Sequence, residues 1–384
     1  MAEQSTNPDL ASFLVTGADG QSWRAQNTES WDPVSFYNWY SDCRRLLLSR
    51  DEVTWLEKHT VPDREVDVFV NMSCGTQLIP HVTLEIVDIL NALGVDFRAG
   101  TGAQYCCGKP FLTNERPDDG HRVTATSRGR FQAWGASTAV HVCPSCQIVQ
   151  THHAEQIEDT SLRNVHFTEF LLNRLEELGD RVPWRKTLDR DVVVHGHDVT
   201  TVHTTARETT ARILGRVPGV QVMGFTDPPP QGNPCATEAP GAPSVLAEVS
   251  DAERREVTRE LAAMAASKGA DMIAVDAHYC HREWQKFGSD DLPVRHYLSI
   301  VAEALDCSHP DRYHEYWHLR DPERVLRLSR PYWTSWGIDE QTARVIAYKN
   351  FKPHFAGYSN PKCGCGGDPR KCTTVQPALS TSGD

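Results

Sequence analysis

One order of strands and helices occurs twice along the chain, and this repeat constrains the fold more than any other feature. Residues 66–72 (VDVFVNM) have the β-branched, apolar composition of a short buried strand. An apolar stripe over residues 84–93, closed by Gly94, predicts an amphipathic helix. The rest of this unit is expected to contain, in order, a strand at 95–100, a helix at 121–134, a strand at 138–142 and a helix at 166–179.

The same order returns after residue 190. Its predicted elements are a strand at 191–195, a helix at 205–217, a strand at 220–225, a helix ending at Gly269, a strand at 271–275 and a helix at 294–305. The two copies also share a residue spacing, because Gly135 precedes Cys146 by 11 positions and Gly269 precedes Cys280 by 11. We therefore expect an α/β fold of tandem, pseudo-duplicated βαβ-type units with short parallel strands.

This repeat predicts four segments. They are an N-terminal extension at 1–65, a first unit at 66–180, a second unit at 181–306 and a C-terminal extension at 307–384. The N-terminal extension carries four tryptophans, which predict either a segment that wraps the core or an arm that docks on a partner. The aromatic, arginine-rich segment 313–336 leaves the same two alternatives, and residues 339–350 predict a helix.

The 12 cysteines carry the chemical signal of this sequence. The N-terminal residues lack the basic and apolar regions of a signal peptide, so we expect a cytoplasmic protein whose clustered thiols bind metal or act in redox chemistry. A net charge of −12 argues against a nucleic-acid partner, and no apolar run reaches the roughly 20 residues of a membrane-spanning helix.

Five of the cysteines lie in the first unit, on three loops that each follow a predicted strand: Cys74, Cys106, Cys107, Cys143 and Cys146. Loops at the ends of parallel strands converge, so these thiols are expected to face one point. Thiolates are soft donors that hold iron–sulfur clusters or Zn²⁺. Because neighbouring side chains diverge, the adjacent pair Cys106-Cys107 favours an assembly of several metal ions, and Gly108 lets the backbone approach it.

The pattern Cys74-x31-Cys106-Cys107-Gly108-x34-Cys143-Pro-Ser-Cys146 resembles the cysteine-rich CCG domain found in the B-type subunit of heterodisulfide reductases. Similar domains occur in iron–sulfur subunits of glycolate and lactate oxidases, and family members usually carry two copies. The resemblance covers about residues 66–306 and implies a noncubane [4Fe-4S] cluster held by the five cysteines. It also implies an oxidoreductase component that acts on a disulfide or another small sulfur-containing substrate.

The second unit departs from this pattern. Its strand ends carry a mixed set of side chains in place of five thiols: His195, His197, Asp198, Cys235, His278 and Cys280, with His203 and His281 nearby. Two thiolates cannot hold a five-cysteine cluster, whereas a Cys/His/Asp set is typical of mononuclear Zn²⁺ or Fe²⁺. The second unit is thus interpreted either as a second metal or substrate site or as a site that has decayed.

The remaining cysteines give weaker signals. Cys363, Cys365 and Cys372 lie close together near the C-terminus and are possible ligands of a further metal, or incidental thiols of a flexible tail. Cys43 and Cys307 are interpreted as packing residues.

Three motifs are absent from the sequence: the ferredoxin run C-x2-C-x2-C-x3-C-P, a strand–GxGxxG–helix fingerprint and a Walker motif. We therefore expect a flavoprotein or ferredoxin-like subunit as electron partner. Two alternatives stay open at this point. One is a pure electron-transfer subunit without its own substrate, and the other is a zinc-binding protein without a redox role.

Overall fold

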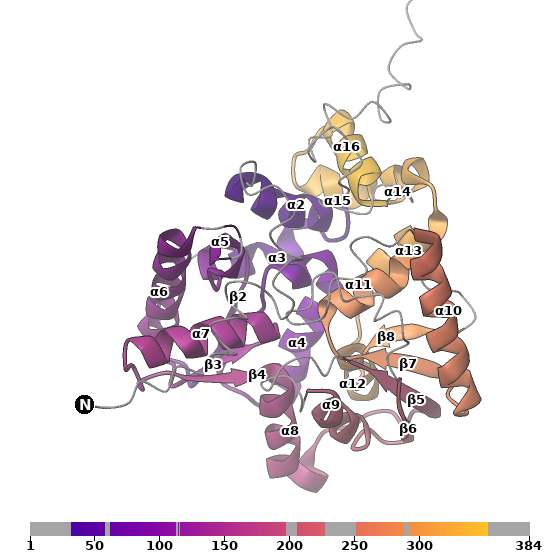
Figure 1. Ribbon diagram of the computed structural model, residues 1–384, viewed down its shortest axis with the longest axis horizontal. Coiled ribbons are helices and arrows are strands. Elements are labelled where there is room, and N and C mark those ends of the chain that lie inside the picture. The colour runs from indigo at the N-terminus through magenta and orange to yellow at the C-terminus, as the bar shows by residue number, and fades with distance from the viewer. Residues whose placement is uncertain are drawn as a thin grey trace, which may run out of the picture.

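The computed structural model describes residues 32–57, 62–112, 114, 116–196, 206–226, 251–287 and 292–351 of the 384-residue chain. Within these ranges the chain forms two four-stranded, all-parallel sheets (Figure 1). Their strand orders, β2-β1-β3-β4 and β6-β5-β7-β8, are the same topology written twice. The predicted α/β fold of tandem βαβ-type units with short parallel strands is confirmed.

The first sheet consists of β1 (Val68–Asn71), β2 (Phe97–Gly100), β3 (Thr138–His141) and β4 (Arg163–His166). The second consists of β5 (Arg190–His195), β6 (Val220–Phe225), β7 (Met272–Val275) and β8 (Val294–His296).

The helices of the first unit are η2 (Gly75–Leu78), α4 (Pro80–Ala92), η3 (Ala103–Tyr105), α5 (Lys109–Leu112), α6 (Pro117–Ala133), α7 (Pro144–Gln156) and α8 (Phe167–Leu178), followed by the short η4 (Gly179–Arg181). Those of the second unit are α9 (Ala206–Leu214), α10 (Asp251–Ser267), α11 (His278–Phe287) and α12 (Tyr297–Leu305). The extensions contribute α2 (Pro33–Arg45), α3 (Arg50–Glu57), α13 (Arg312–Leu319), α14 (Pro322–Leu328), α15 (Arg330–Ser335) and α16 (Glu340–Phe351).

Each unit contains a helix and a strand that the hydrophobic pattern did not predict. They are α7 with β4, and α11 with β8. Helix α7 has buried positions almost all round, so its sequence lacks the apolar stripe of a surface helix, although Pro144 at its first turn is a helix-start signal. Strands β4 and β8 are short and run directly into α8 and α12, so the sequence shows no break between strand and helix.

Successive residues of a strand point to opposite faces of its sheet, and here the two faces pack in different hydrophobic cores. In β5, Val192 and Val194 face the larger core shared by both units, whereas Val193 faces a separate core beneath α10. In the same way Val70 of β1 faces the shared core and Phe69 faces a core with Phe131 of α6. This period of two places one face of both sheets against a common layer of helices.

The common layer has an approximate symmetry. Helix α4 of the first unit packs against α12 of the second, and α9 of the second packs against α8 of the first (Figure 1). The last helices α8 and α12 both begin after a histidine, His166 or His296, whose Nδ1 accepts the backbone N–H two residues on at 3.4 Å. The duplication therefore includes the sheets, the histidine caps of α8 and α12, and the helix contacts between the two units.

The extensions cover this double unit. Trp39 of α2 is buried and donates to Asn350 Oδ1 of α16 at 3.0 Å, which ties the two extensions together. In the C-terminal segment the side chains of Tyr313, Trp317 and Trp333 are buried in the shared core. These aromatic residues therefore pack against the two units. Over the described ranges, no helix combines the length and apolarity needed to cross a membrane.

Candidate metal centre

The candidate centre lies where β1, β2 and β3 end. These three strands are neighbours in the first sheet, so their carboxyl ends form one continuous edge. Cys74 follows β1, Cys106 and Cys107 follow β2 after the single turn η3, and Cys143 follows β3. The structure thus brings all three predicted cysteine loops to the same edge.

The first loop turns sharply just before its cysteine. Ser73 has a positive φ of 63°, a conformation that costs a residue with a side chain roughly 1–2 kcal/mol. Two hydroxyl groups hold the loop in place, since Thr101 Oγ1 donates to Ser73 O at 2.5 Å and Thr76 Oγ1 donates to Met72 O at 2.6 Å. The loop is therefore fixed by β1 and β2 together.

The second loop is anchored by α6. Ser127 Oγ donates to Cys106 O at 2.6 Å, and Thr124 Oγ1 donates to Cys107 O at 2.7 Å. Gly108 has a φ of 86°, and a Cβ atom there would lie 2.4 Å from Gly120 O, so only glycine fits between the cysteine pair and α6. The Gly108 N–H donates to Cys106 Sγ at 3.3 Å. Close backbone approach, expected from the sequence, is therefore toward α6 and the Cys106 thiol.

The third loop is the start of α7. Cys143 is the N-cap residue, Pro144 opens the helix, and the Cys146 N–H donates to Cys143 O at 3.0 Å. The unpaired N–H groups at a helix start favour negative charge, so this position stabilises thiolates.

The five thiols interact in a chain. Cys106 interacts with Cys107, Cys107 with Cys146, and Cys146 with Cys143, while Cys74 interacts electrostatically with Cys107 and Cys143. Cys106, Cys107 and Cys146 are buried, and Cys74 and Cys143 are half-buried. All five are free thiols, and their loops share one edge of the first sheet.

Their protonation is uneven. The neighbouring thiols of Cys106 and Cys146 hold the pKa of Cys107 well below its usual range. The neighbouring thiol of Cys146, and then the nearby His278 ring, lower the pKa of Cys143 although burial opposes this. Burial raises the pKa of Cys74. The set thus stabilises negative charge on at least two sulfurs, as a metal-binding group of thiols requires.

Cationic and hydroxyl groups surround these sulfurs. Lys109 of α5 donates to Ser145 Oγ at 3.2 Å, and its charge acts on Cys143 and Cys107. Tyr37, on α2 of the N-terminal extension, interacts electrostatically with Cys106, and burial raises the pKa of its hydroxyl. We selected neither residue from the sequence. Lys109 directly follows the Cys-Cys-Gly motif, and this position could have indicated it. No sequence feature indicates Tyr37.

His278 joins this centre from the second unit. Its ring interacts electrostatically with Cys143, and neither ring nitrogen has a hydrogen-bond partner among the described residues. The ring lies directly on Gly75, where a Cβ atom would be 2.2 Å from His278 Cε1. The repeat in the sequence grouped His278 with the second-unit strand ends, but its contacts are with the first unit.

The other residues selected in the second unit are placed differently. His195, at the end of β5, is buried, shares a hydrogen bond with Thr226 Oγ1 at 2.8 Å and contacts the Trp284 ring edge-on. Cys280 is buried in the apolar core beneath α10. His197, Asp198, His203 and Cys235 lie outside the described residues, as do the tail cysteines Cys363, Cys365 and Cys372. A second site at these strand ends stays a prediction.

Comparisons with known proteins bear on the first unit. Residues 68–149 match the family of cysteine-rich domains designated CCG. Over 274 residues the chain is 23% identical to one subunit of the dihydromethanophenazine:CoB–CoM heterodisulfide reductase of Methanosarcina acetivorans. That match takes in 68% of this chain and 65% of the relative, so the chain spans less than two thirds of the relative's length.

Among solved structures, one similar chain is a hypothetical protein from Helicobacter pylori. The similarity has a TM-score of 0.44 at 10% identity, and it covers 82% of this chain and 61% of that one.

Proposed function

We propose that this chain is the iron–sulfur subunit of a multi-subunit oxidoreductase, because residues 68–149 match the CCG family of cysteine-rich domains. The observation that carries the proposal is the convergence of five free thiols from three strand-end loops. Such a site calls for metal, since buried thiolates without a cation are costly. The heterodisulfide reductase relative points in the same direction.

We assign a noncubane [4Fe-4S] cluster to Cys74, Cys106, Cys107, Cys143 and Cys146. The donor set fits such a group, because every ligand is a sulfur and the adjacent pair suits an assembly with several irons. The spread of the thiols favours it over zinc. Four thiolates around one Zn²⁺ at about 2.3 Å must all lie close together, but no three of these described thiols form a donor group within 4.8 Å.

The proposed substrate class rests on the type of cluster and on the side chains that lie beside the thiols. We propose a disulfide or another small sulfur-containing substrate, because an irregular cluster supplies electrons together with an iron that can bind sulfur. His278 and Tyr37 then serve as hydrogen-bonding groups beside Cys143 and Cys106, and Lys109 offers a positive charge to an anionic substrate. The electron partner is a flavoprotein or ferredoxin-like subunit.

Anaerobic purification with metal and sulfide counts tests the first part. A [4Fe-4S] cluster gives about four irons and four acid-labile sulfides per chain and a brown protein. One or two zinc ions without sulfide would overturn the proposal in favour of a zinc protein.

A single-turnover experiment tests the substrate. The chemically reduced protein, mixed with a small aliphatic disulfide, is expected to lose its reduced spectrum while two thiols form for every two chains oxidised. One disulfide takes two electrons and two protons, and each cluster supplies one electron. A pure electron-transfer subunit would keep its reduced spectrum until an oxidised partner protein is added.

A further inference from the structure

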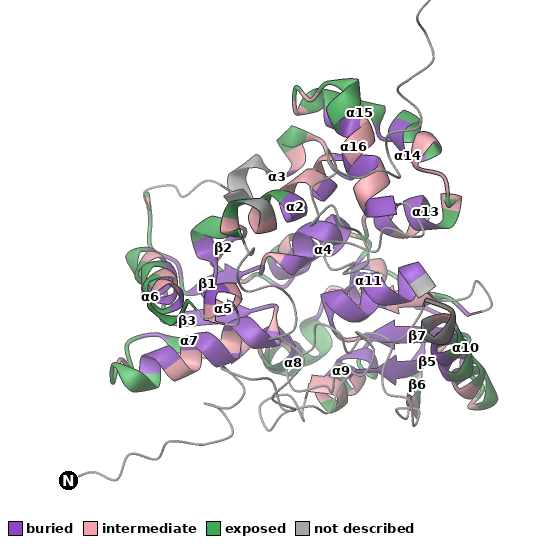
Figure 2. Ribbon diagram, turned by 45° about the horizontal axis from the view of Figure 1, so that its top comes forward, coloured by how far each residue is buried: buried purple, intermediate pink, exposed green. Residues whose placement is uncertain are grey.

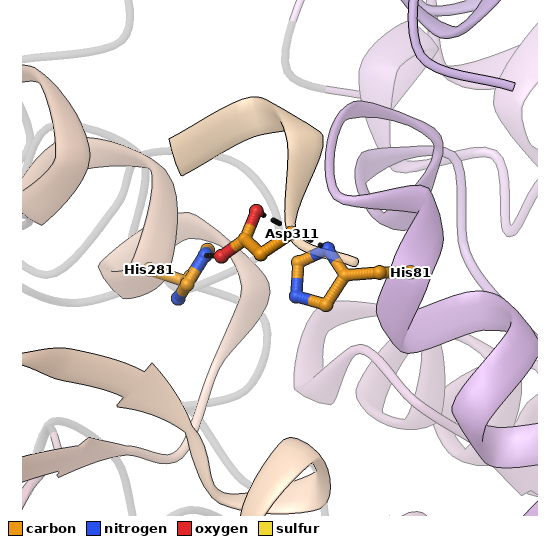
Figure 3. Close-up of side chains that lie close together, drawn as sticks. All are labelled: His81, His281 and Asp311. Carbon is orange, nitrogen blue, oxygen red and sulfur yellow. Dashed lines mark hydrogen bonds and ion pairs between the residues drawn. The ribbon is translucent and has the colours of Figure 1, made fainter. Parts of the chain in front are cut away.

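A second group of metal-ligating side chains lies away from the thiols. His81 is the second residue of α4, His281 lies in α11, and Asp311 precedes α13 (Figure 3). These elements belong to the first unit, the second unit and the C-terminal extension. The Asp311 carboxylate lies between the two imidazole rings, with one oxygen directed to each.

The donor atoms are close enough for one ion. One nitrogen or oxygen from each residue lies within 4.8 Å of the others. His281 Nε2 is 2.7 Å from Asp311 Oδ2, and His81 Nδ1 is 3.4 Å from Asp311 Oδ1. The two rings are 5.4 Å apart and inclined by 58°, so they do not stack and both edges stay available to a shared ligand.

Both histidines are buried, and they have ring nitrogens that make no hydrogen bond to the described residues. The exposed fraction is 2% for His81 and 0% for His281. Neither ring nitrogen of His81 makes a hydrogen bond to the described residues, and Nδ1 of His281 makes none either. Buried polar atoms in folded proteins are nearly always paired, and a bound ion is one standard reason for an exception.

The charge states suit a cation. Burial lowers the pKa of His81 to about 4. Burial opposes ionisation of Asp311, but the neighbouring histidines and the N–H of His314 outweigh it and hold its pKa below the usual range. Two imidazole side chains and one carboxylate form a set typical of Zn²⁺ or Fe²⁺.

We infer that His81, His281 and Asp311 bind one divalent transition-metal ion, Zn²⁺ or Fe²⁺, at the junction of the two units and the C-terminal extension. The site shares no residue with the five thiols, and its nitrogen and oxygen donors do not suit an iron–sulfur cluster. It also differs from the predicted second site, because two of its three ligands lie outside the second unit. The inference therefore stands or falls independently of the proposed function.

The position of the ion gives it a structural consequence. His281 and His278 are one helical turn apart on α11, so they lie on neighbouring positions of one face. An ion that fixes His281 against α4 also fixes the start of α11, which brings His278 to Cys143. Helices α4 and α11 are largely buried along their length (Figure 2), so this junction has little room to rearrange.

The test uses the full-length protein, isolated anaerobically, with zinc, iron and acid-labile sulfide measured on the same sample. We expect one metal ion per chain beyond the iron that the sulfide accounts for. In Asp311→Asn and His81→Gln the excess metal is expected to fall roughly tenfold, while sulfide stays unchanged. Asparagine can still accept the His314 N–H at the start of α13, so Asp311→Asn removes the charge and keeps the helix cap.

Two controls separate this site from others. His152→Gln changes a partly buried histidine of α7 outside the group and should leave the excess metal in place. A Cys363→Ser/Cys365→Ser/Cys372→Ser variant removes the tail thiols and should also retain it. Protein isolated from zinc-supplemented, anaerobic cultures fills the site with Zn²⁺, and X-ray absorption at the zinc edge should then give only nitrogen and oxygen neighbours at about 2.0–2.2 Å.

The inference is overturned by wild-type protein without excess metal, by excess metal that survives both Asp311→Asn and His81→Gln, or by sulfur neighbours at about 2.3 Å. Sulfide content and circular dichroism of each variant identify a chain that has failed to fold, and the absorption spectrum of the wild type decides the ligands without any variant.

Discussion

The ends of β3 and β7 occupy equivalent places in two sheets of the same topology, yet their loops do different things. After β3, Cys143 and Cys146 begin α7 and direct two thiols to their own sheet edge. After β7, α11 begins at His278, whose ring contacts Cys143 of the other unit. One copy supplies the thiols and its sister supplies a side chain that completes their surroundings.

The second copy need not hold a cofactor of its own to matter. The approximate symmetry packs each unit's first helix against the other unit's last helix, so the strand ends of one copy lie within reach of the other. A duplicated unit that has lost three of its thiols can therefore still contribute to the chemistry of its twin.

The strongest effect is expected from a thiol of the first unit. Cys146→Ser is expected to lower iron and acid-labile sulfide roughly tenfold or more, because it removes a soft ligand from a buried set. Cys280→Ala, the sister position, and Cys43→Ala in α2 are expected to keep both at the wild-type level. Iron loss in Cys280→Ala equal to that in Cys146→Ser would break the contrast between the units.

A pH effect distinguishes the two equivalent helix interfaces. Glu85 of α4 is buried against Ser299 of α12, and burial raises its pKa to about 8 from 4.5. The folded protein therefore retains a proton that the unfolded chain releases, and the free energy of unfolding falls as pH rises from about 4.5 to about 8. The upper limit of this loss is about 5 kcal/mol.

Glu85→Gln is expected to abolish that part of the pH dependence, measured by denaturant unfolding of both proteins at about pH 5 and about pH 8. The matched control is Glu176→Gln in α8, whose exposed carboxylate pairs with Arg212 of α9 at 2.8 Å. Breaking that pair should cost about 1 kcal/mol or less at either pH. Parallel pH profiles for wild type and Glu85→Gln would contradict the buried-carboxyl explanation.

The contact between the units can be probed at Gly75. In Gly75→Ala the new Cβ meets the His278 ring at 2.2 Å, which should destabilise the protein by about 1–3 kcal/mol. Removing the ring as well, in Gly75→Ala/His278→Ala, should recover most of that loss. Gly129→Ala in α6 has no atom within 4 Å and should stabilise by about 0.5–1 kcal/mol. Thermal unfolding measures all three, and a double variant no more stable than Gly75→Ala would count against the contact.

The mildest effect is electronic. His278→Gln should change stability little but shift the midpoint potential of the thiol-bound centre by on the order of 50 mV. The ring interacts electrostatically with Cys143, and an interaction of about 1.4 kcal/mol with a charged sulfur corresponds to 59 mV for one electron. Redox titration followed by electron paramagnetic resonance measures it, with His121→Gln on the surface of α6 as the unshifted control. Equal potentials in all three proteins would confine His278 to packing.

The sequence predicted which loops share a sheet edge better than it predicted what surrounds them. The five cysteines lie on or just after three loops that follow strands, and a parallel sheet places such loops on one edge whatever the details of packing. Helix α7 was missed because its burial on most sides erases the amphipathic stripe, and β4 because it is four residues long and merges with α8. The positions of Tyr37 and Lys109 beside the thiols depend on how α2 and α5 pack in the folded protein.

The repeated order of elements and the contents of each strand end can be read from the chain alone, since both follow from local periodicity and covalent spacing. Which copy His278 serves, and that His81, His281 and Asp311 meet, depends on the folded arrangement. Those contacts cross the interface of α4, α11 and α13, and their geometry is set by how buried helices pack, which no single segment encodes.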